Sequence, residues 1–468
     1  MNNPPRITDT RLKALELNFA GDRYGTFAEI GAGQEVVRWF FSVGAASGTV
    51  AKSISAYDMQ VSDAIYGTSD RYVSRSRLET MLEHEYDLNI ERLGPLRGRD
   101  TAFFAFADTV AARSYRGSSE CHAWMGIRFQ AHPQDQPNQV IVHVRMKDLE
   151  NLQQQEALGI VGVNLVYGAA FLSRQPELLL ESLVDGLSPD RVEIDMVEFS
   201  GVEFRSVDNR VMSLRLVQLG FSDAAMFSST GQVLQASEVL YKTPVLVQRG
   251  NFRPATKVHL DLQKCAWEQF NQSPDAGRRG TASVLEITMS NLLTDGTVNL
   301  TDFLNRVDML SNVTDSFVLI SNFSEHYRLV NFLMRFAPPK VGLALGALTL
   351  TEIFNPKYYE QLQGGVLEAI GRLCKNNLSL YVYPAFHPED NTVLTAANIP
   401  VGPELKSLHQ YLLDRGTLIS LDEADLSFLS ICSADVLEMI RARNSDWEDC
   451  VPEGVTEAIK SRHLFGYR

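Results

Sequence analysis

Short apolar runs alternate with helical patterns in the second half of the chain, at a spacing of about 30 residues. Residues 284–291, 317–322, 340–346 and 378–384 have the composition of buried strands. Helical patterns follow the first three runs, and the first of these helices begins with Asn299 as its cap. This alternation is typical of βαβ units, whose strands run parallel and are joined by right-handed crossovers. The sequence therefore predicts an α/β fold with a mostly parallel sheet in the C-terminal region.

The first half of the chain has a different pattern. Residues 122–132 and 140–148 alternate between polar and apolar side chains on either side of the turn-forming residues 133–139, which predicts a β-hairpin. Residues 191–199, 202–207 and 210–220 are interpreted as further antiparallel strands. An α+β N-terminal region containing antiparallel hairpins is therefore expected.

A polar segment rich in Pro and Gly, residues 271–280, is the clearest candidate for a domain boundary. The expected organisation has four parts, which are a mainly helical region (1–110), an α+β region with antiparallel strands (111–272), a parallel α/β domain (281–400) and a C-terminal helical segment (401–468).

Charge and cysteine usage limit the function classes. The net charge is −14 and the Lys and Arg residues are scattered, whereas a nucleic-acid-binding protein normally carries a basic patch, so nucleic acid is not an expected partner. The longest nearly apolar run, residues 157–172, is shorter than the ~20 residues of a bilayer span, so we expect a buried helix and no membrane span. The five cysteines are far apart and form no CxxC pair, which favours a reducing cytoplasm over a disulfide framework or a structural zinc site.

Two successive predicted strands end alike, in Met-Ser-Asn at 289–291 and Ile-Ser-Asn at 320–322. In open parallel sheets, ligands bind beyond the carboxyl ends of the strands. Asn291, Ser321 and Asn322 are therefore candidate substrate-binding residues. His326, near the start of the next helix, would be kept neutral by the helix dipole and is the one candidate for a catalytic residue. Alternatively, these Ser and Asn residues only cap helices and form turns.

The predicted hairpin carries basic and aromatic side chains on one face. With a period of two, one strand places His122, Trp124, Arg128 and His132 together, and the other places His143, Arg145 and Lys147 together. Arg128, His143 and Arg145 are candidate ligands for an acidic or phosphorylated small molecule. An ordinary solvated face is the alternative. A metal site is not predicted, because the histidines are spread over two strands and the sequence fixes no carboxylate near them.

Three segments carry a resemblance to a known family, namely GAGQEVVRWFFSVGAASGTVAKSISAYDM, ECHAWMGIRFQ and LMRFAPPKVGLALGALTLTEIFNPKYYEQLQGGVLEAIGRL. The chain resembles an uncharacterised bacterial protein family, some of whose members carry the name nicotinate-nucleotide adenylyltransferase, nearly from end to end. Enzymes of that name use an HxGH motif at the end of the first strand. None of the nine histidines here lies in HxGH or HxxH, so no functional residue is carried over.

Two classes of function remain open. One is a cytoplasmic protein that binds, and as an enzyme transforms, a small anionic or nucleotide-like metabolite at the C-terminal edge of the parallel sheet. The other is a non-catalytic assembly or scaffold protein. A homo-oligomer would suit both classes. The sequence contains no GxSxG or HExxH motif and indicates no cofactor.

Overall fold

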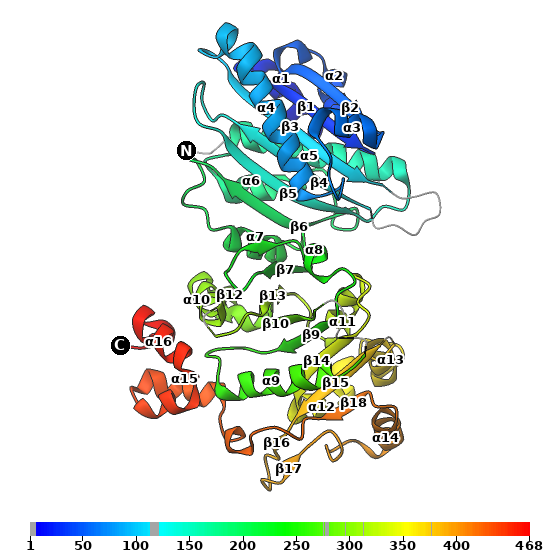
Figure 1. Cartoon of the computed structure of the whole chain (residues 1–468), viewed down its shortest axis with the longest axis vertical. Coiled ribbons are helices and arrows are strands. Elements are labelled where there is room, and N and C mark those ends of the chain that lie inside the picture. Colours follow the sequence, from blue (N-terminus) through cyan, green and yellow to red (C-terminus); the bar gives the residue numbers. More distant parts are fainter. Residues whose placement is uncertain are drawn as a thin grey trace. The chain divides into compact units, whose positions relative to one another are not determined.

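The chain divides into two compact units, residues 1–222 and 223–468, in a computed structural model (Figure 1). The structure describes residues 6–112, 121–274, 276, 280–294, 296–311, 313–375 and 377–468. The division differs from the expected boundary at 271–280. That segment connects helix α9 to strand β10 inside the second unit, and four of its residues lie outside the described ranges.

The described strands of the first unit form a six-stranded sheet in the order β2-β1-β3-β4-β5-β6. Its first three strands are parallel, and β3, β4, β5 and β6 pair antiparallel. The predicted hairpin is confirmed as β4 and β5. The strands are β1 Arg23–Gly31, β2 Val50–Ala56, β3 Ala102–Ala111, β4 His122–Phe129, β5 Asn138–Met146 and β6 Val192–Ser200.

Helices cover both faces of this sheet. α1, α2, α5 and α6 pack over one face, where they enclose the main apolar core of the unit, and α4 packs on the other face against β3 and β4. The helices are α1 Thr10–Ala20, α2 Val36–Val43, α3 Met59–Tyr66, α4 Arg75–Arg97, α5 Asn151–Phe171, α6 Pro176–Ser182 and α7 Asn209–Gln218.

The nearly apolar run 157–172 forms most of helix α5, which is buried against the sheet, as predicted. Gly162 allows α5 to approach α2 closely, since a Cβ atom there would lie 2.3 Å from Cγ2 of Val36. No helix among the described residues is long and apolar enough to cross a membrane.

Helices make up more of residues 1–110 than strands do, although β1, β2 and most of β3 also lie there. One expectation for the first unit was wrong. Residues 202–207 form turns, and 209–218 form helix α7 instead of a strand. The Asp208 carboxylate caps α7 by accepting from the N–H of Arg210 at 2.9 Å, and Met212 and Leu216 reach the core at helical spacing.

The main sheet of the second unit has eight described strands in the order β18-β15-β14-β9-β10-β13-β7-β8. Two short antiparallel pairs are separate from it, β11 Leu293–Thr294 with β12 Thr297–Val298 and β16 Ala385–Phe386 with β17 Val393–Leu394. The six strands from β18 to β13 are parallel, and β7 and β8 add an antiparallel edge. This sheet confirms the predicted mostly parallel α/β fold. The strands are β7 Ala224–Phe227, β8 Val233–Leu234, β9 Val245–Arg249, β10 Ala282–Thr288, β13 Phe317–Ser321, β14 Val341–Gly346, β15 Leu378–Tyr383 and β18 Leu418–Ser420.

The order of the parallel strands reverses in the middle of this sheet. The chain runs outward from β9 through β10 to β13, and then returns to β14 on the other side of β9 before continuing to β15 and β18. β9 and β14 are therefore the pair at which the strand order switches.

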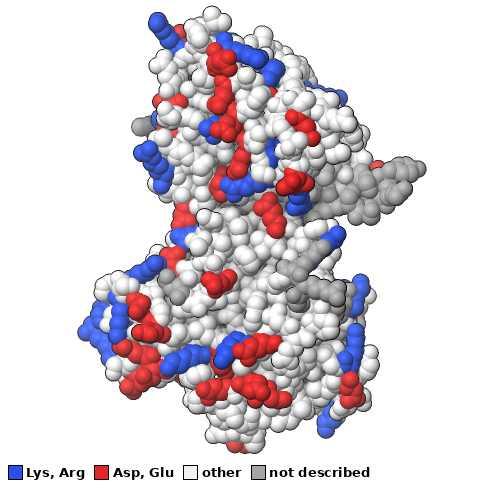
Figure 2. All heavy atoms as spheres, in the orientation of Figure 1, with Lys and Arg blue, Asp and Glu red and all other residues white. Residues whose placement is uncertain are grey.

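Helices also cover both faces of the second sheet. α9 packs on one face through residues such as Phe270, and α11, α12, α13 and α14 pack on the other. The helices are α8 Ala236–Leu240, α9 Lys257–Asn271, α10 Leu300–Ser311, α11 His326–Met334, α12 Ala347–Ile353, α13 Gly365–Leu373, α14 Lys406–Asp414, α15 Ser433–Ala442 and α16 Glu453–Arg462. On the face shown in Figure 2, Lys and Arg side chains lie among Asp and Glu side chains in each unit.

Candidate functional site

The carboxyl ends of β10 and β13 lie side by side in the second unit. The two strands pair in parallel with Thr288 opposite Ser321. Asn291 lies just beyond β10 in a 3-10 helix, Met289–Leu292, and Asn322 directly follows β13 and is exposed. The two Ser-Asn tips therefore share one edge of the sheet, as the sequence predicts. Their contact with a ligand stays a prediction.

A buried ion pair supports this edge. Arg249 at the end of β9 donates to the Glu286 carboxylate, from Nε to Oε2 at 2.6 Å and from Nη2 to Oε1 at 3.1 Å. The Ser321 hydroxyl also donates to Glu286, and both of these residues are fully buried. Arg249 reaches onward to the carbonyl oxygens of Phe323 and Ser324, each at 2.9 Å. Ser321 and Arg249 thus fix the loop between β13 and α11 in place.

His326 is the first residue of α11, close to this ion pair. Its Nε2 atom is buried and has no hydrogen-bond partner among the described residues. Burial and the positive charge of Arg249 lower the pKa of His326 to about 3. The imidazole is therefore neutral at physiological pH, in keeping with the prediction.

The loop from β9 to α9, residues 250–256, lies at the point where the strand order switches. Thr256 caps α9 together with His259, whose Nδ1 accepts the backbone N–H of Thr256 at 3.0 Å. Because Nδ1 is an acceptor, the neutral ring carries its hydrogen on Nε2, and burial lowers the pKa of His259 to about 4. Lys257 is the first residue of α9, a helix of 15 residues.

A second set of ion pairs holds this loop. Nε of Arg253 donates to Oδ1 of Asp302 at 2.9 Å, and Arg306 pairs with the same carboxylate. Nη1 of Arg306 donates to the Asn251 side-chain oxygen at 2.7 Å and to its carbonyl oxygen at 3.1 Å. The loop after β9 is therefore tied to α10 by the side chains of Asn251, Arg253, Asp302 and Arg306.

Sequence reasoning missed Arg249, Thr256, Lys257 and His259, because the parallel sheet was expected to begin after residue 280. A signal was present, since the apolar run VLV at 245–247 is followed by Gly250-Asn251 and Arg253-Pro254 and then by a Thr in capping position.

In the first unit, the structure joins His122 and His143 to a carboxylate. Nδ1 of His122 lies 2.9 Å from Nε2 of His143, and Nδ1 of His143 is hydrogen-bonded to Asp195 of β6. Asp195 lies at a β-bulge, where the register between β5 and β6 shifts after His143. His143 is only 2% exposed and packs against Trp124, so the polar face of this hairpin is not simply solvated.

The basic residues of the hairpin also have partners. Arg145 forms an ion pair with the buried carboxylate of Glu193 on β6. Arg128 donates to Oε1 of Gln139 at 3.3 Å, and its guanidinium lies 5.5 Å from the ring centre of Tyr86. The predicted anion-binding role of Arg128, His143 and Arg145 remains untested. Among the described residues, no group of three or more His, Cys, Asp or Glu side chains could hold a metal ion.

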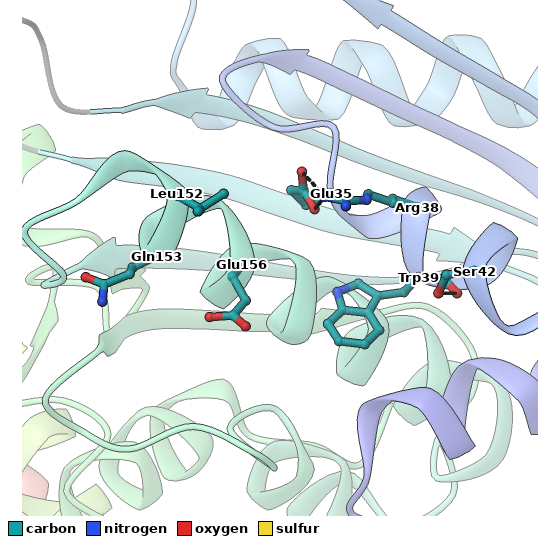
Figure 3. Close-up of a pocket in the computed structure, with 7 residues that line it drawn as sticks. All are labelled: Glu35, Arg38, Trp39, Ser42, Leu152, Gln153 and Glu156. Atoms are coloured by element: carbon teal, nitrogen blue, oxygen red, sulfur yellow. Dashed lines mark hydrogen bonds and ion pairs between the residues drawn. The ribbon is translucent and has the colours of Figure 1, made fainter.

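Two cavities open on the first unit. A groove of about 370 Å³ lies between α2 and α5, where Trp39 extends from α2 toward α5 and Glu35 pairs with Arg38 at 3.0 Å (Figure 3). A larger cavity of about 740 Å³ lies at the carboxyl ends of β1, β2 and β3. Neither is lined by a residue that the sequence analysis selected as a site.

No protein-family model matches the chain, and no curated protein is similar to it in sequence. Solved structures that are similar to parts of it include the following three. The competence/damage inducible protein CihA from Agrobacterium tumefaciens has 16% identity and a TM-score of 0.25, and the match covers 36% of this chain and 99% of that one. A Plasmodium falciparum nicotinic acid mononucleotide adenylyltransferase complexed with APC has 13% identity and a TM-score of 0.31. The match covers 48% of this chain and 98% of that one.

The third is a competence-damaged protein (CinA) superfamily member from Enterobacter cloacae, with 14% identity, a TM-score of 0.23, and 39% of this chain and 98% of that chain covered. At such low identities and TM-scores, these likenesses carry no argument about function. The resemblance to the uncharacterised bacterial family, some of whose members carry the name nicotinate-nucleotide adenylyltransferase, therefore stays a prediction.

Proposed function

We propose that the second unit binds a small anionic, nucleotide-like metabolite at the carboxyl edge of its parallel sheet. The observation that carries this proposal is the reversal of strand order between β9 and β14. At such a reversal the loops that follow the two strands turn toward opposite faces of the sheet, which leaves a crevice that ligands occupy.

The start of α9 supplies groups that suit an anion. The first N–H groups of a helix have no partner within the helix and lie at the positive end of its dipole. A phosphate placed there would accept hydrogen bonds from the backbone at Lys257 and Val258 and would also meet the Lys257 ammonium. His259 adds a neutral Nε2–H donor near the same helix start.

The neighbouring tips would hold the uncharged part of the ligand. Asn291 and Asn322 carry amide groups that both donate and accept, and His326 has a buried ring nitrogen without a partner among the described residues. In this arrangement the neutral imidazole ring of His326 orients the ligand.

Thermal unfolding with added ligands tests this proposal. AMP, ribose 5-phosphate and inorganic phosphate are the anionic probes, and a ligand at 100 times its Kd stabilises by about 2.7 kcal/mol. Lys257→Ala should weaken the stabilisation. Lys264→Ala is the matched control, because Lys264 is an exposed lysine of the same helix, beyond its first turn.

Equal effects of the two lysine substitutions, or no stabilisation by any anionic probe, would contradict the proposal. A native mass above that of one chain that does not change with ligand, together with flat unfolding curves, would favour the assembly protein instead.

A further inference from the structure

The larger cavity of the first unit is built from polar but nearly uncharged groups. It has a volume of about 740 Å³, within the usual range for small-molecule sites, and it is lined by side chains such as Gln34, Tyr57 and Tyr72. Asp58 is the only charged residue among the described residues that line it. Its carboxylate already caps α3 by accepting the N–H groups of Gln60 and Val61. The described residues that line the cavity therefore offer a ligand no free counter-charge.

Ser62 gives this cavity an unused hydrogen-bonding group. The residue lines the cavity and is 2% exposed, and its hydroxyl has no hydrogen-bond partner among the described residues. A buried hydroxyl without a partner costs free energy, because it has lost water and gained nothing in return. A ligand hydroxyl or amide group in the cavity would satisfy it.

A histidine lies in the strand next to the cavity lining. His122 pairs with Ala111 across β3 and β4, and Ala111 lines the cavity. When Asp195 is ionised and the His143 ring is neutral, His143 donates from Nδ1 and accepts at Nε2. His122 must then donate from Nδ1, which leaves the lone pair on its own Nε2.

Charged neighbours keep this nitrogen unprotonated. Burial, His143 and the positive charges of Arg71 and Arg145 lower the pKa of His122 to about 4, against the opposite effect of Asp195. His122 therefore stays a neutral acceptor in the physiological range, with its tautomer set by the chain of hydrogen bonds behind it.

We propose that this cavity is a second small-molecule site, which takes an uncharged ligand carrying hydroxyl or amide groups, with Ser62 as its hydrogen-bonding partner and His122 of the neighbouring strand as a nearby acceptor. The site is independent of the anion site in the second unit. It differs from that site in ligand class, because neither Lys nor Arg is among the described residues that line it.

Binding of neutral probes to the full chain tests this site. Adenosine, uridine and D-ribose are expected to raise the melting temperature, and Ser62→Ala is expected to weaken their binding by about 2- to 10-fold, the value of one hydrogen bond. Ser213→Ala is the matched control, because Ser213 is also 2% exposed with an unpartnered hydroxyl in the described structure but lies on α7, outside the cavity.

The two sites can be separated by cross-testing. Lys257→Ala should leave binding of the neutral probes unchanged, and Ser62→Ala should leave binding of inorganic phosphate unchanged. A flat response to all neutral probes, or equal effects of Ser62→Ala and Ser213→Ala, would overturn the cavity site without touching the anion site.

The state of His122 is tested without any ligand by ¹⁵N NMR of histidine-labelled protein. Wild type should show His122 with hydrogen on Nδ1 and none on Nε2, whereas free imidazole side chains favour hydrogen on Nε2. His143→Phe should return His122 to that ordinary preference. Hydrogen on Nε2 of His122 in the wild-type protein would overturn its role as acceptor.

Discussion

Glu29 of β1 and Asp108 of β3 lie opposite each other in adjacent parallel strands, 1% and 0% exposed. Glu29 accepts the backbone N–H groups of Gln34 at 3.0 Å, Val36 at 2.8 Å and Val37 at 3.2 Å, and so anchors the start of α2. The oxygens of Asp108 make no hydrogen bond of ordinary geometry among the described residues, and the nearby backbone of Ile30 is the group that favours the ionised form. Burial, with the negative charge of Glu29, raises the pKa of Asp108 well above its ordinary value, so the folded protein keeps the Asp108 proton to higher pH than the unfolded chain does.

Asp108→Asn should remove a loss of stability that wild type suffers as pH rises. Above the unfolded pKa of about 3.8, the unfolded chain releases a proton that the folded chain keeps, so the free energy of unfolding falls with rising pH. Asparagine has no proton to lose. Urea unfolding at pH 5 and pH 8 should show that the free energy of unfolding of the variant, relative to that of wild type, is higher at pH 8 than at pH 5.

The exposed Asp100→Asn is the control for this experiment, and its difference from wild type should not vary with pH in the same range. A pH-independent difference for Asp108→Asn would mean that the folded carboxyl titrates normally.

Arg249→Met should destabilise the second unit strongly. Glu286 is 0% exposed and would be left as a buried charge without its partner, a change that typically costs about 3–5 kcal/mol. Lys460→Met tests the same substitution in the exposed pair with Glu448, at 42% and 38% exposure, where a loss of under about 1 kcal/mol is expected. Urea unfolding measures both. Similar small losses for the two variants would show that Glu286 is solvated or protonated without Arg249.

Gly25→Ala and Gly371→Ala should change stability in opposite directions. A Cβ atom at Gly25 would lie 2.1 Å from the carbonyl oxygen of Phe104 in the neighbouring strand, so the first unit must distort, at a cost of about 1–3 kcal/mol or more. At Gly371, inside α13, nothing lies within 4 Å of the added atom, and alanine should stabilise the helix by about 0.5–1 kcal/mol. Thermal unfolding distinguishes the two, and a stabilised Gly25→Ala would contradict the close approach of β1 and β3.

The parallel sheet was predictable where its strands are buried on both faces. β13, β14 and β15 are nearly continuous apolar runs, which is the pattern expected of such strands, and β10 has one charged residue, Glu286, among its apolar ones. β1 was missed because Thr26 and Glu29 interrupt its apolar sequence. Both are buried with partners from elsewhere in the chain, Thr26 through Asn89 of α4 and Glu29 through the start of α2. Tertiary partners of that kind cannot be read from a local pattern.

The candidate sites also depend on tertiary partners that the local sequence pattern does not reveal. His122 and His143 could be placed on one face from their alternation alone. Asp195, which completes their hydrogen-bonded chain, comes from a bulge in β6, and a bulge breaks the period of two on which that alternation depends. The cap of α7 at Asp208 was readable from the sequence, but the alternation of residues 210–220 favoured a strand.

His326→Gln should reduce the loss of stability that wild type shows on acidification. The pKa of His326 is about 3 in the folded protein against an ordinary value of 6.5. Between these values the unfolded chain binds a proton that the folded chain does not, so the free energy of unfolding rises with pH across this window and is lost as pH falls. Glutamine does not titrate, so urea unfolding at pH 4 and pH 7 should show a smaller difference for the variant. His463→Gln, at an exposed position, is the control. If His326→Gln lost as much stability at pH 4 as wild type does, the ring would be protonated in the folded protein, and it could not orient a ligand as a neutral group.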